Sequence, residues 1–272
     1  MLLVKNEADI LEWSLADASR YLDYIYVLDN GSDDGTWELV QAIAAANSRV
    51  VPMGRELAPF SDALRSRIFN AFRERAQEGD WWCRFDADEI YAEDPRAKLA
   101  AVAPHQHVVF GQFLLYELTH DEADRLGGGN AGDRPPTISP ANCPRFYLKS
   151  YLHAEARFFR HRPKLVWNTG SWPRHMGINA PEHVLIKHFR YRSPAQIQLR
   201  LDTRHAATAA GWPNFAHDVE NSWTQKLRQP DEVYFDAHDG RYASDFAAVA
   251  TSREPRSHVL VKRLLHGTGI WP

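Results

Sequence analysis

The first half of the chain alternates short apolar runs with segments in which apolar residues recur at helical spacing. The apolar runs predict strands, and they cover residues 2–4, 24–28, 50–51 and 81–85. The segments between them, among them residues 62–77, predict helices. This alternation predicts an α/β fold with a mostly parallel central sheet and helices on both faces.

The pattern changes after residue 105. A long strand is predicted over residues 107–116, and further strands within residues 145–152 and 155–167. The segment between the first two, residues 117–143, is rich in glycine and proline and poor in core-forming residues. It predicts a mobile loop, longer than a compact domain usually contains, that could close over a site.

One helix in the second half, over residues 192–211, has both start and stop signals. A serine cap, a first-turn proline, a glutamine that completes a capping box and a terminal glycine mark its ends: Ser193, Pro194, Gln196 and Gly211. The remaining tail is less regular, with short helical segments predicted near residues 219–227 and 259–264.

Composition narrows the class of protein. The 272 residues carry a net charge of −3, without the basic excess of a nucleic-acid-binding protein. Cys83 and Cys143 are too few for a disulfide framework, so a reducing compartment is expected, with Cys83 as a core thiol. No apolar stretch has transmembrane length, and the opening MLLVKNEADI reaches charge too soon for a signal peptide. We expect a cytoplasmic protein, which a surface patch or a partner could hold at the inner face of the membrane.

A cluster of carboxylates, Asp86, Asp88 and Glu89, follows the apolar run that ends at residue 85. Acidic residues often end a strand because they suit turns and helix N-caps. Two aspartates at positions i and i+2 could instead bind one Mg²⁺ or Mn²⁺ ion. Ligands of parallel sheets bind beyond the carboxyl ends of the strands, where this cluster is expected, and this favours the metal.

Three motifs together resemble the family 2 glycosyltransferases of the GT-A fold. They are VKNEADILEWSL, IYVLDNGSDDGT and GDWWCRFDADE, in this order within residues 1–90. A later segment, LIKHFRYRSPAQ, is similar to one in bacterial members that build surface polysaccharides. The resemblance implies one GT-A domain with a nucleotide-sugar half (1–115), an acceptor half (116–210) and a C-terminal helical extension (211–272).

The resemblance also implies an activity. The enzyme would move a sugar from a nucleotide-sugar donor, with a UDP-sugar favoured, to a glycan or lipid-linked acceptor, with inversion at the anomeric carbon. A Mn²⁺ or Mg²⁺ ion would neutralise the departing diphosphate. In this reading Asp88 is the first metal ligand, Asp86 reaches the metal or the ribose, and His188 is a late third ligand, although a lone histidine is more often simply packed. Glu89 either supports the site or caps the next turn.

Further residues match the donor pocket of the family. Asp29 matches the residue that accepts from N3–H of uracil or thymine, and a structural turn is the alternative. Asn6 and Glu7 match the start of the donor pocket. The alternative is that they only cap a helix. One of Arg65 and Arg67 is expected to contact the diphosphate rather than lie exposed on a helix.

Arg190 and Arg192 alternate with aromatic residues, so on a strand they would share one face and suit a departing diphosphate. An inverting displacement needs a general base near the acceptor hydroxyl. Glu182 is the first candidate and His175 the second; Met176 stands where related sequences tend to have a glutamate.

Two other functions remain open at this point. A metal-dependent nucleotidyltransferase is one, but the segment after the first strand, KNEADI, lacks the glycines usual in those enzymes. A non-catalytic module that binds sugar nucleotides or glycans is the other, and the missing glutamate favours it.

Overall fold

The computed structural model describes residues 1–127, 133–150, 153–211, 219–243 and 254–272. Its strands are β1 (Leu2–Val4), β2 (Ile25–Asp29), β3 (Val50–Arg55), β4 (Trp81–Cys83), β5 (Phe85–Asp86), β6 (Glu89–Tyr91), β7 (Val108–Leu115), β8 (Phe146–Leu148), β9 (Ala154–Arg160), β10 (Asn179–His188) and β11 (Val233–Phe235). Its α-helices are α1 (Leu11–Ala18), α2 (Thr36–Ala46), α3 (Arg65–Phe72), α4 (Pro95–Ala101), α5 (His120–Arg125), α6 (Pro194–Ala209) and α7 (Arg256–Gly267). Short 3₁₀ helices are η1 (Asp62–Leu64), η2 (Arg73–Arg75), η4 (Trp223–Lys226) and η5 (Pro230–Glu232).

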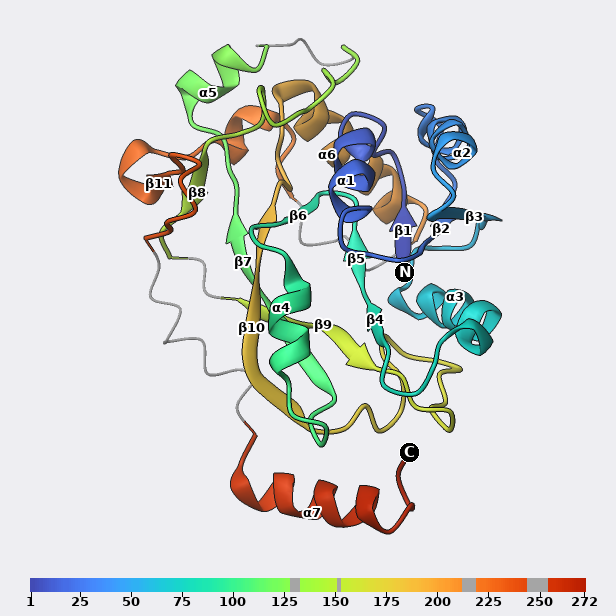
Figure 1. Ribbon diagram of the computed structural model, residues 1–272. Helices are drawn as coiled ribbons and strands as arrows, with labels where there is room; N and C mark the ends of the chain where they lie inside the picture. Colours follow the sequence, from blue (N-terminus) through green and yellow to red (C-terminus); the bar gives the residue numbers. More distant parts are fainter. Residues whose placement is uncertain (128–132, 151–152, 212–218, 244–253) are drawn as a thin grey trace.

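The first sheet has the strand order β3-β2-β1-β5, and every pairing in it is parallel. Successive residues of β1 point to opposite faces: Leu2 and Val4 pack in a core with α1 and α2, and Leu3 packs in a second core with α3. The helices therefore cover both faces of the sheet (Figure 1). The predicted α/β fold with a parallel sheet is confirmed.

The register of this sheet aligns the two predicted acidic segments. Leu3 of β1 is paired with Leu28 of β2 on one side and with Asp86 of β5 on the other, and Val4 is paired with Asp29. Because the strands are parallel, Asp29 and Asp86 lie at the same, carboxyl-terminal edge, as the sequence predicts.

The strand predicted over residues 81–85 is divided between two sheets. β4 pairs antiparallel with β9, whereas β5 pairs with β1. The backbone crosses over at Arg84, whose N–H donates to the carbonyl of Arg157 at 2.8 Å, and the next N–H, of Phe85, donates to Met1 at 3.2 Å. Periodicity alone cannot reveal such a crossing, because residues 81–83 and Phe85 are all apolar or nearly so and predict one continuous strand.

The second sheet is mixed, with the order β4-β9-β7-β10-β6. β10 runs parallel to β7 and antiparallel to β6, with His188 opposite Glu89. The N–H of Phe189 donates to the carbonyl of Asp88 at 2.7 Å. This pairing brings the end of β10 to the acidic turn between β5 and β6, a hundred residues earlier in the chain.

The predictions for the second half are right in part. Helix α6 begins as expected, since the Ser193 side chain accepts from the Gln196 N–H, but the Gln196 side chain accepts from Arg192 rather than closing a capping box on Ser193. The predicted loop 117–143 contains α5, which Thr119 caps. Residues 128–132 of that loop, including three of its four glycines, lie outside the described residues.

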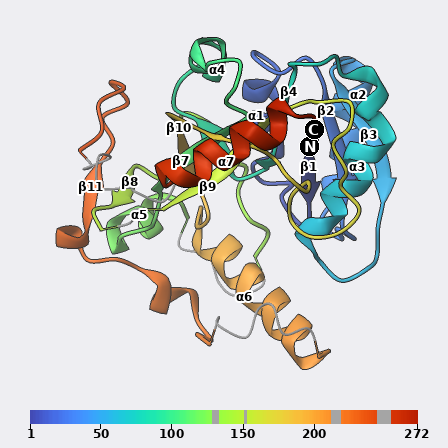
Figure 2. The same cartoon turned by 90° about the horizontal axis from the view of Figure 1, so that it is seen from below.

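The tail holds one long helix. Its predicted segment near residues 219–227 is only the 3₁₀ turn η4, whereas the one near 259–264 is the core of α7. Helix α7 lies at the end of the molecule opposite α1, α2 and α6 (Figure 1) and crosses the end of the second sheet when viewed from below (Figure 2). Among the described helices, none is long and apolar enough to cross a membrane.

Candidate functional site

A cleft of about 940 Å³ opens at the carboxyl ends of β1, β2 and β5. The loops that follow these three strands form one wall and helix α6 forms the other, and Arg134, Pro135 and Thr137 add to the lining. Polar lining residues from the loops include Asn6, Glu7, Asp86 and Asp88, and helix α6 contributes Arg200 and Arg204. The cleft therefore has a carboxylate-rich wall opposite a wall that carries cations.

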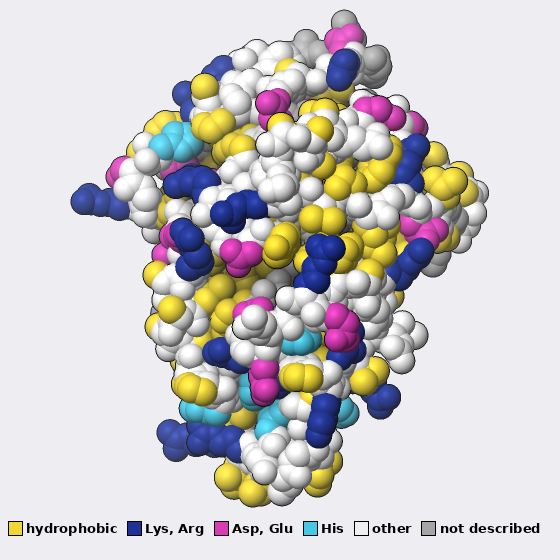
Figure 3. All heavy atoms as spheres, turned by 45° about the vertical axis from the view of Figure 1, so that its right-hand side comes forward, with side chains coloured by type: hydrophobic (Ala, Val, Ile, Leu, Met, Phe, Trp, Pro, Cys, Tyr) yellow, Lys and Arg dark blue, Asp and Glu magenta, His cyan; other side chains and the backbone are white. Residues whose placement is uncertain are grey.

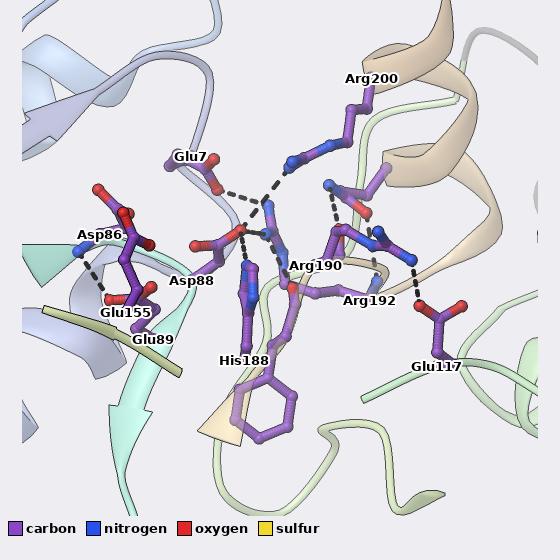
Figure 4. Close-up of polar contacts among 12 residues, drawn as sticks. Glu7, Asp86, Asp88, Glu89, Glu117, Glu155, His188, Arg190, Arg192 and Arg200 are labelled. Carbon is purple, nitrogen blue, oxygen red and sulfur yellow. Dashed lines mark hydrogen bonds and ion pairs between the residues drawn. The ribbon is translucent and has the colours of Figure 1, made fainter. Parts of the chain in front are cut away.

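Asp88 lies at the centre of the site and is surrounded by cations (Figure 4). Its Oδ2 atom is 3.3 Å from Nε2 of His188, 3.7 Å from Nη1 of Arg200 and 4.0 Å from Nη1 of Arg192. Burial alone would raise the pKa of the Asp88 carboxyl, but these cations outweigh it and hold that pKa well below its usual range. Asp88 is therefore an ionised carboxylate that lines the cleft.

His188 shares this environment. Burial would lower the pKa of its imidazole, but the adjacent Asp88 carboxylate outweighs burial and raises the pKa above its usual value. Its Nε2 atom lines the cleft beside Asp88, while its ring packs against Phe113 at 5.7 Å between centroids. The histidine is thus held by packing on one side and presents a nitrogen to the cleft on the other.

Asp86 and Glu89 belong to a second cluster of charges at the edge of the cleft, of which Asp86 lines the cleft and Glu89 does not. Asp86 pairs with Arg65 and lies 3.5 Å from Nη1 of Arg157. Burial would raise the pKa of Asp86, but Arg65 and Arg157 outweigh it and lower that pKa. Glu89 pairs with Arg157, and its other oxygen accepts from the Asp86 N–H at 3.3 Å. Burial raises the pKa of Glu89 to about 7, against the opposing effect of Arg157.

Arg192 joins the first loop to the start of α6. It is fully buried and donates to both carboxylate oxygens of Asp9 at 2.7 Å and to Glu7 at 2.7 Å. Burial raises the pKa of Glu7 to about 7, although Arg192 acts in the opposite direction. Arg190 points elsewhere, to Glu117 (Figure 4). The expectation that Arg190 and Arg192 share a strand face is wrong, because β10 ends at His188.

Asn6 holds two loops together instead of capping a helix. Its backbone is left-handed, with φ of 56°, and helix α1 begins only at Leu11. The Asn6 side chain accepts from the Asp33 N–H at 3.0 Å, and its own N–H donates to Ser32 at 3.0 Å. The N-cap alternative for Asn6 is wrong, and the side chain lies on the cleft wall.

Asp29 lies beneath this wall. Its carboxylate is fully buried and accepts from the N–H groups of Gly31 and Ser32, at 3.2 and 3.1 Å, and from Nε of Arg55 at 2.9 Å. The lining of the cleft comes instead from the next two residues, Asn30 and Gly31. Asp29 therefore shapes the loop after β2. This is the structural turn that the sequence offered as the alternative to contact with the base.

Three predicted residues lie away from the cleft. Arg67 is half-exposed and pairs with Glu56. Glu182 is six residues before His188 on the extended strand β10, roughly 20 Å along the strand. His175, with φ of 58°, stacks on Trp271 at 4.3 Å between ring centroids. The structure does not bring either candidate base to the cleft. β10 carries Glu182 away from His188, and His175 lies beside Trp271 instead.

The sequence interpretation missed the cations of α6. Gln196, Arg200, Thr203 and Ala207 recur every three or four residues and all line the cleft. This spacing is visible in the sequence, but it identifies only a polar helix face and not what the face meets. Arg157, a second missed cation, links Asp86 to Glu89 from β9.

The described residues contain no group of three or more histidines, cysteines or carboxylates arranged to hold a metal ion. Asp88 and His188 nevertheless offer two adjacent ligand atoms at the cleft. Mg²⁺ is commonly bound by one or two carboxylates together with substrate phosphates and water, rather than by a complete protein cage. The site therefore fits a divalent ion that is shared with a phosphorylated ligand.

Comparison with known proteins gives limited similarity. The chain matches no protein-family model and no curated protein. Among solved structures, it is similar to a mannosyltransferase from Pyrobaculum calidifontis in complex with GDP-Man and Mn²⁺. The two chains are 14% identical with a TM-score of 0.40, and the match covers 99% of this chain and 78% of the other. Similarity at this level does not establish a shared activity.

Proposed function

We propose that this chain is an inverting, metal-dependent glycosyltransferase of the GT-A type that uses a nucleotide-sugar donor. The observation that carries the proposal is the pair formed by Asp88 and His188, 3.3 Å apart at the carboxyl edge of a parallel sheet and facing the cations of α6. A cleft of about 940 Å³ is also within the usual range for ligand pockets, about 300–1,000 Å³.

The charges of the site suit a nucleoside diphosphate. Asp88 and His188 would hold the divalent ion, which would neutralise charge on the departing diphosphate. Arg200 and Arg204 line the opposite wall and would bind the phosphate oxygens. Asp86, held by Arg65, would orient the ribose or reach the metal.

The donor base would lie against the loop after β2. A UDP-sugar is the favoured donor, and its base would lie against Asn30 and Gly31, in the loop that the buried Asp29 carboxylate holds in shape. Asn6 and Glu7 would contact the donor from the neighbouring loop. Arg190 and Arg192 would act by fixing the site: Arg192 holds Glu7, and Arg190 holds Glu117.

The acceptor side follows from the same proposal. A hydroxyl of a glycan or of a lipid-linked acceptor would attack the anomeric carbon, in a pathway of surface glycan synthesis. Residues 1–115 would form the donor half, residues 116–210 the acceptor half, and residues 211–272 a C-terminal extension. The proton of that hydroxyl needs a base. Glu182 and His175 are the candidates from the sequence, but neither lines the cleft, so we expect another group to take this role. A cytoplasmic location matches a nucleotide-sugar substrate.

The test is ligand-induced stabilisation. UDP-, GDP- and dTDP-sugars, with and without Mn²⁺, are added to the purified chain, and a ligand that binds only the folded state raises Tm. We expect a rise that requires both a nucleotide sugar and the metal, and that Asp88→Asn abolishes. Asp124→Asn, an exposed change on α5, is the matched control and should respond like the wild type.

An assay of donor hydrolysis on the same ligands, together with Tm measurements on added nucleoside triphosphates, separates the competing functions. Slow metal-dependent hydrolysis of the bound donor supports a transferase, and binding without any turnover supports a non-catalytic module. A response to nucleoside triphosphates alone would indicate a nucleotidyltransferase and would overturn the proposal.

A further inference from the structure

Helix α7 has its apolar side turned away from the protein. It is a 12-residue helix without a single buried residue. Leu260, Val261 and Leu264 are 61%, 53% and 60% exposed, and Ile270 just beyond the helix is 70% exposed. These four side chains, the α7 apolar stripe, form one side of the helix and its C-terminal end. An amphipathic helix of a globular protein normally buries that side.

The opposite side of α7 attaches to the body through polar and aromatic contacts. Lys262 donates to the carbonyl of Gly177 at 2.7 Å, and Arg263 approaches Nε2 of His105 at 2.6 Å. The ring of His266 lies 4.6 Å from that of His107. These contacts fix the orientation of the helix, so the exposure of its apolar stripe is a consequence of how α7 is docked.

The charged side chains of α7 and the residues after it are all basic. From residue 255 to residue 272 the chain carries Arg256, Lys262 and Arg263 and no acidic residue, and of these Lys262 is paired with Glu254 just before the segment. Arg256 and Arg263 are exposed at the margin of the stripe. A helix whose apolar stripe has cations along one margin resembles the helices that lie in the interface of an anionic membrane.

The shape of the surface also favours a bilayer. At the lower end of the molecule in Figure 3, where α7 lies, hydrophobic side chains form the extremity and Lys, Arg and His side chains lie above them. One side of a 12-residue helix has an area of roughly 200 Å², whereas a stable protein interface needs about 800 Å² from each partner. A second copy of the chain would therefore gain too little contact here.

We propose that α7 docks the protein on an anionic lipid surface, with the α7 apolar stripe inserted between the acyl chains and Arg256, at the margin of the stripe, among the headgroups. Each buried methylene favours insertion, and each cation near the surface adds attraction to anionic lipid. The docked helix lies at the far end from the cleft, so the cleft would stay open to water. This proposal does not depend on the proposed activity.

The test is co-sedimentation of the purified chain with vesicles of phosphatidylcholine alone or mixed with phosphatidylglycerol. We expect binding to the mixed vesicles that weakens with added salt, and little binding to phosphatidylcholine. Leu260→Gln combined with Leu264→Gln should lower the partition coefficient at least about tenfold, since two leucines lose their burial. Arg256→Glu should weaken binding to the mixed vesicles alone.

Val219→Gln, a change of an exposed apolar residue elsewhere, is the matched control and should bind like the wild type. The Leu260/Leu264 variant should still bind nucleotide, and Asp88→Asn should still bind vesicles, which separates this proposal from the proposed activity. Wild-type protein that stays in the supernatant with the mixed vesicles overturns it. So does a concentration-dependent dimer in sedimentation velocity that the double variant abolishes.

Discussion

At the scale of the residue, the cations around Asp88 explain how a buried carboxylate stays charged. His188, Arg200 and Arg192 all lie within 4.0 Å of its Oδ2 atom. A carboxylate without these partners would tend to protonate when buried. Two of these cations, His188 and Arg200, also line the cleft. The oxygens of a bound diphosphate could therefore take the place of the Asp88 carboxylate as partners of Arg200.

Arg200 should therefore contribute to binding of a diphosphate. We expect Arg200→Ala to weaken UDP binding in the presence of Mn²⁺ by about tenfold to a hundredfold, from the loss of a hydrogen bond to a charged group. Isothermal titration calorimetry measures this change. Arg241→Ala, which removes an exposed arginine elsewhere, is the control, and an unchanged Kd in Arg200→Ala would remove that residue from the proposed donor site.

Glu182 can be tested as the general base by its effect on turnover. A general base usually contributes about a hundredfold or more to the rate. Because Glu182 is roughly 20 Å along β10 from His188, we expect Glu182→Gln to change kcat far less than that, with donor affinity unchanged. Steady-state kinetics decide the point: a hundredfold loss would identify Glu182 as the base, and such a loss in His175→Gln would identify His175.

At the scale of the element, helix α6 depends on its first turn. Ser193 is buried and caps it, Pro194 occupies its first position, and Arg200 then projects into the cleft from the second turn. The orientation of the cleft wall thus depends on residues that do not themselves line the cleft.

Loss of that cap should lower stability by a predictable amount. We expect Ser193→Ala to lower the free energy of unfolding by about 1 kcal/mol, the typical value for an N-cap. Urea denaturation measures the change, and Ser193→Thr, which keeps the hydroxyl, is the control. Equal stability in Ser193→Ala and the wild type would mean that packing alone holds the first turn.

At the scale of the whole molecule, the contact between α7 and the second sheet includes a histidine that is neutral in the fold. Burial lowers the pKa of His107 to about 3, and Arg162, His266, Arg160 and His105 act in the same direction. Its Nδ1 atom accepts from the Ile178 N–H at 3.2 Å, which needs the neutral ring. Protonation of His107 is therefore coupled to unfolding.

The sign of the pH dependence follows from this coupling. The unfolded chain has an ordinary histidine pKa of 6.5, so between pH 6.5 and about 3 it binds more protons at His107 than the folded chain does. Stability should be unaffected by this group above pH 6.5 and should fall as the pH drops below it. Urea unfolding across this range should give a shallower pH dependence in His107→Asn than in the wild type.

The control for this measurement is His120→Asn, which changes an exposed histidine at the start of α5. It should keep the pH dependence of the wild type. An equal slope in His107→Asn and the wild type would contradict the assignment of acid sensitivity to His107.

Much of the fold of residues 1–115 could be predicted from the sequence by itself. The alternation of apolar runs with helical patterns determined the parallel sheet, and Asp29 and Asp86 follow strands whose carboxyl ends must meet. The cap of α6 at Ser193 is also local. These features follow from residues near one another in the chain, whose periodicity and turn preferences are independent of the rest of the fold.

Only the tertiary structure decided which charges meet. Asp88 and His188 come together because β10 pairs with β6 in one particular register, and the chain crosses between sheets at Arg84. The outward apolar stripe of α7 likewise depends on how Lys262 docks the helix. Long-range pairing of this kind is set by the packing of the whole chain, so a local pattern can name the residues at the site but not their partners.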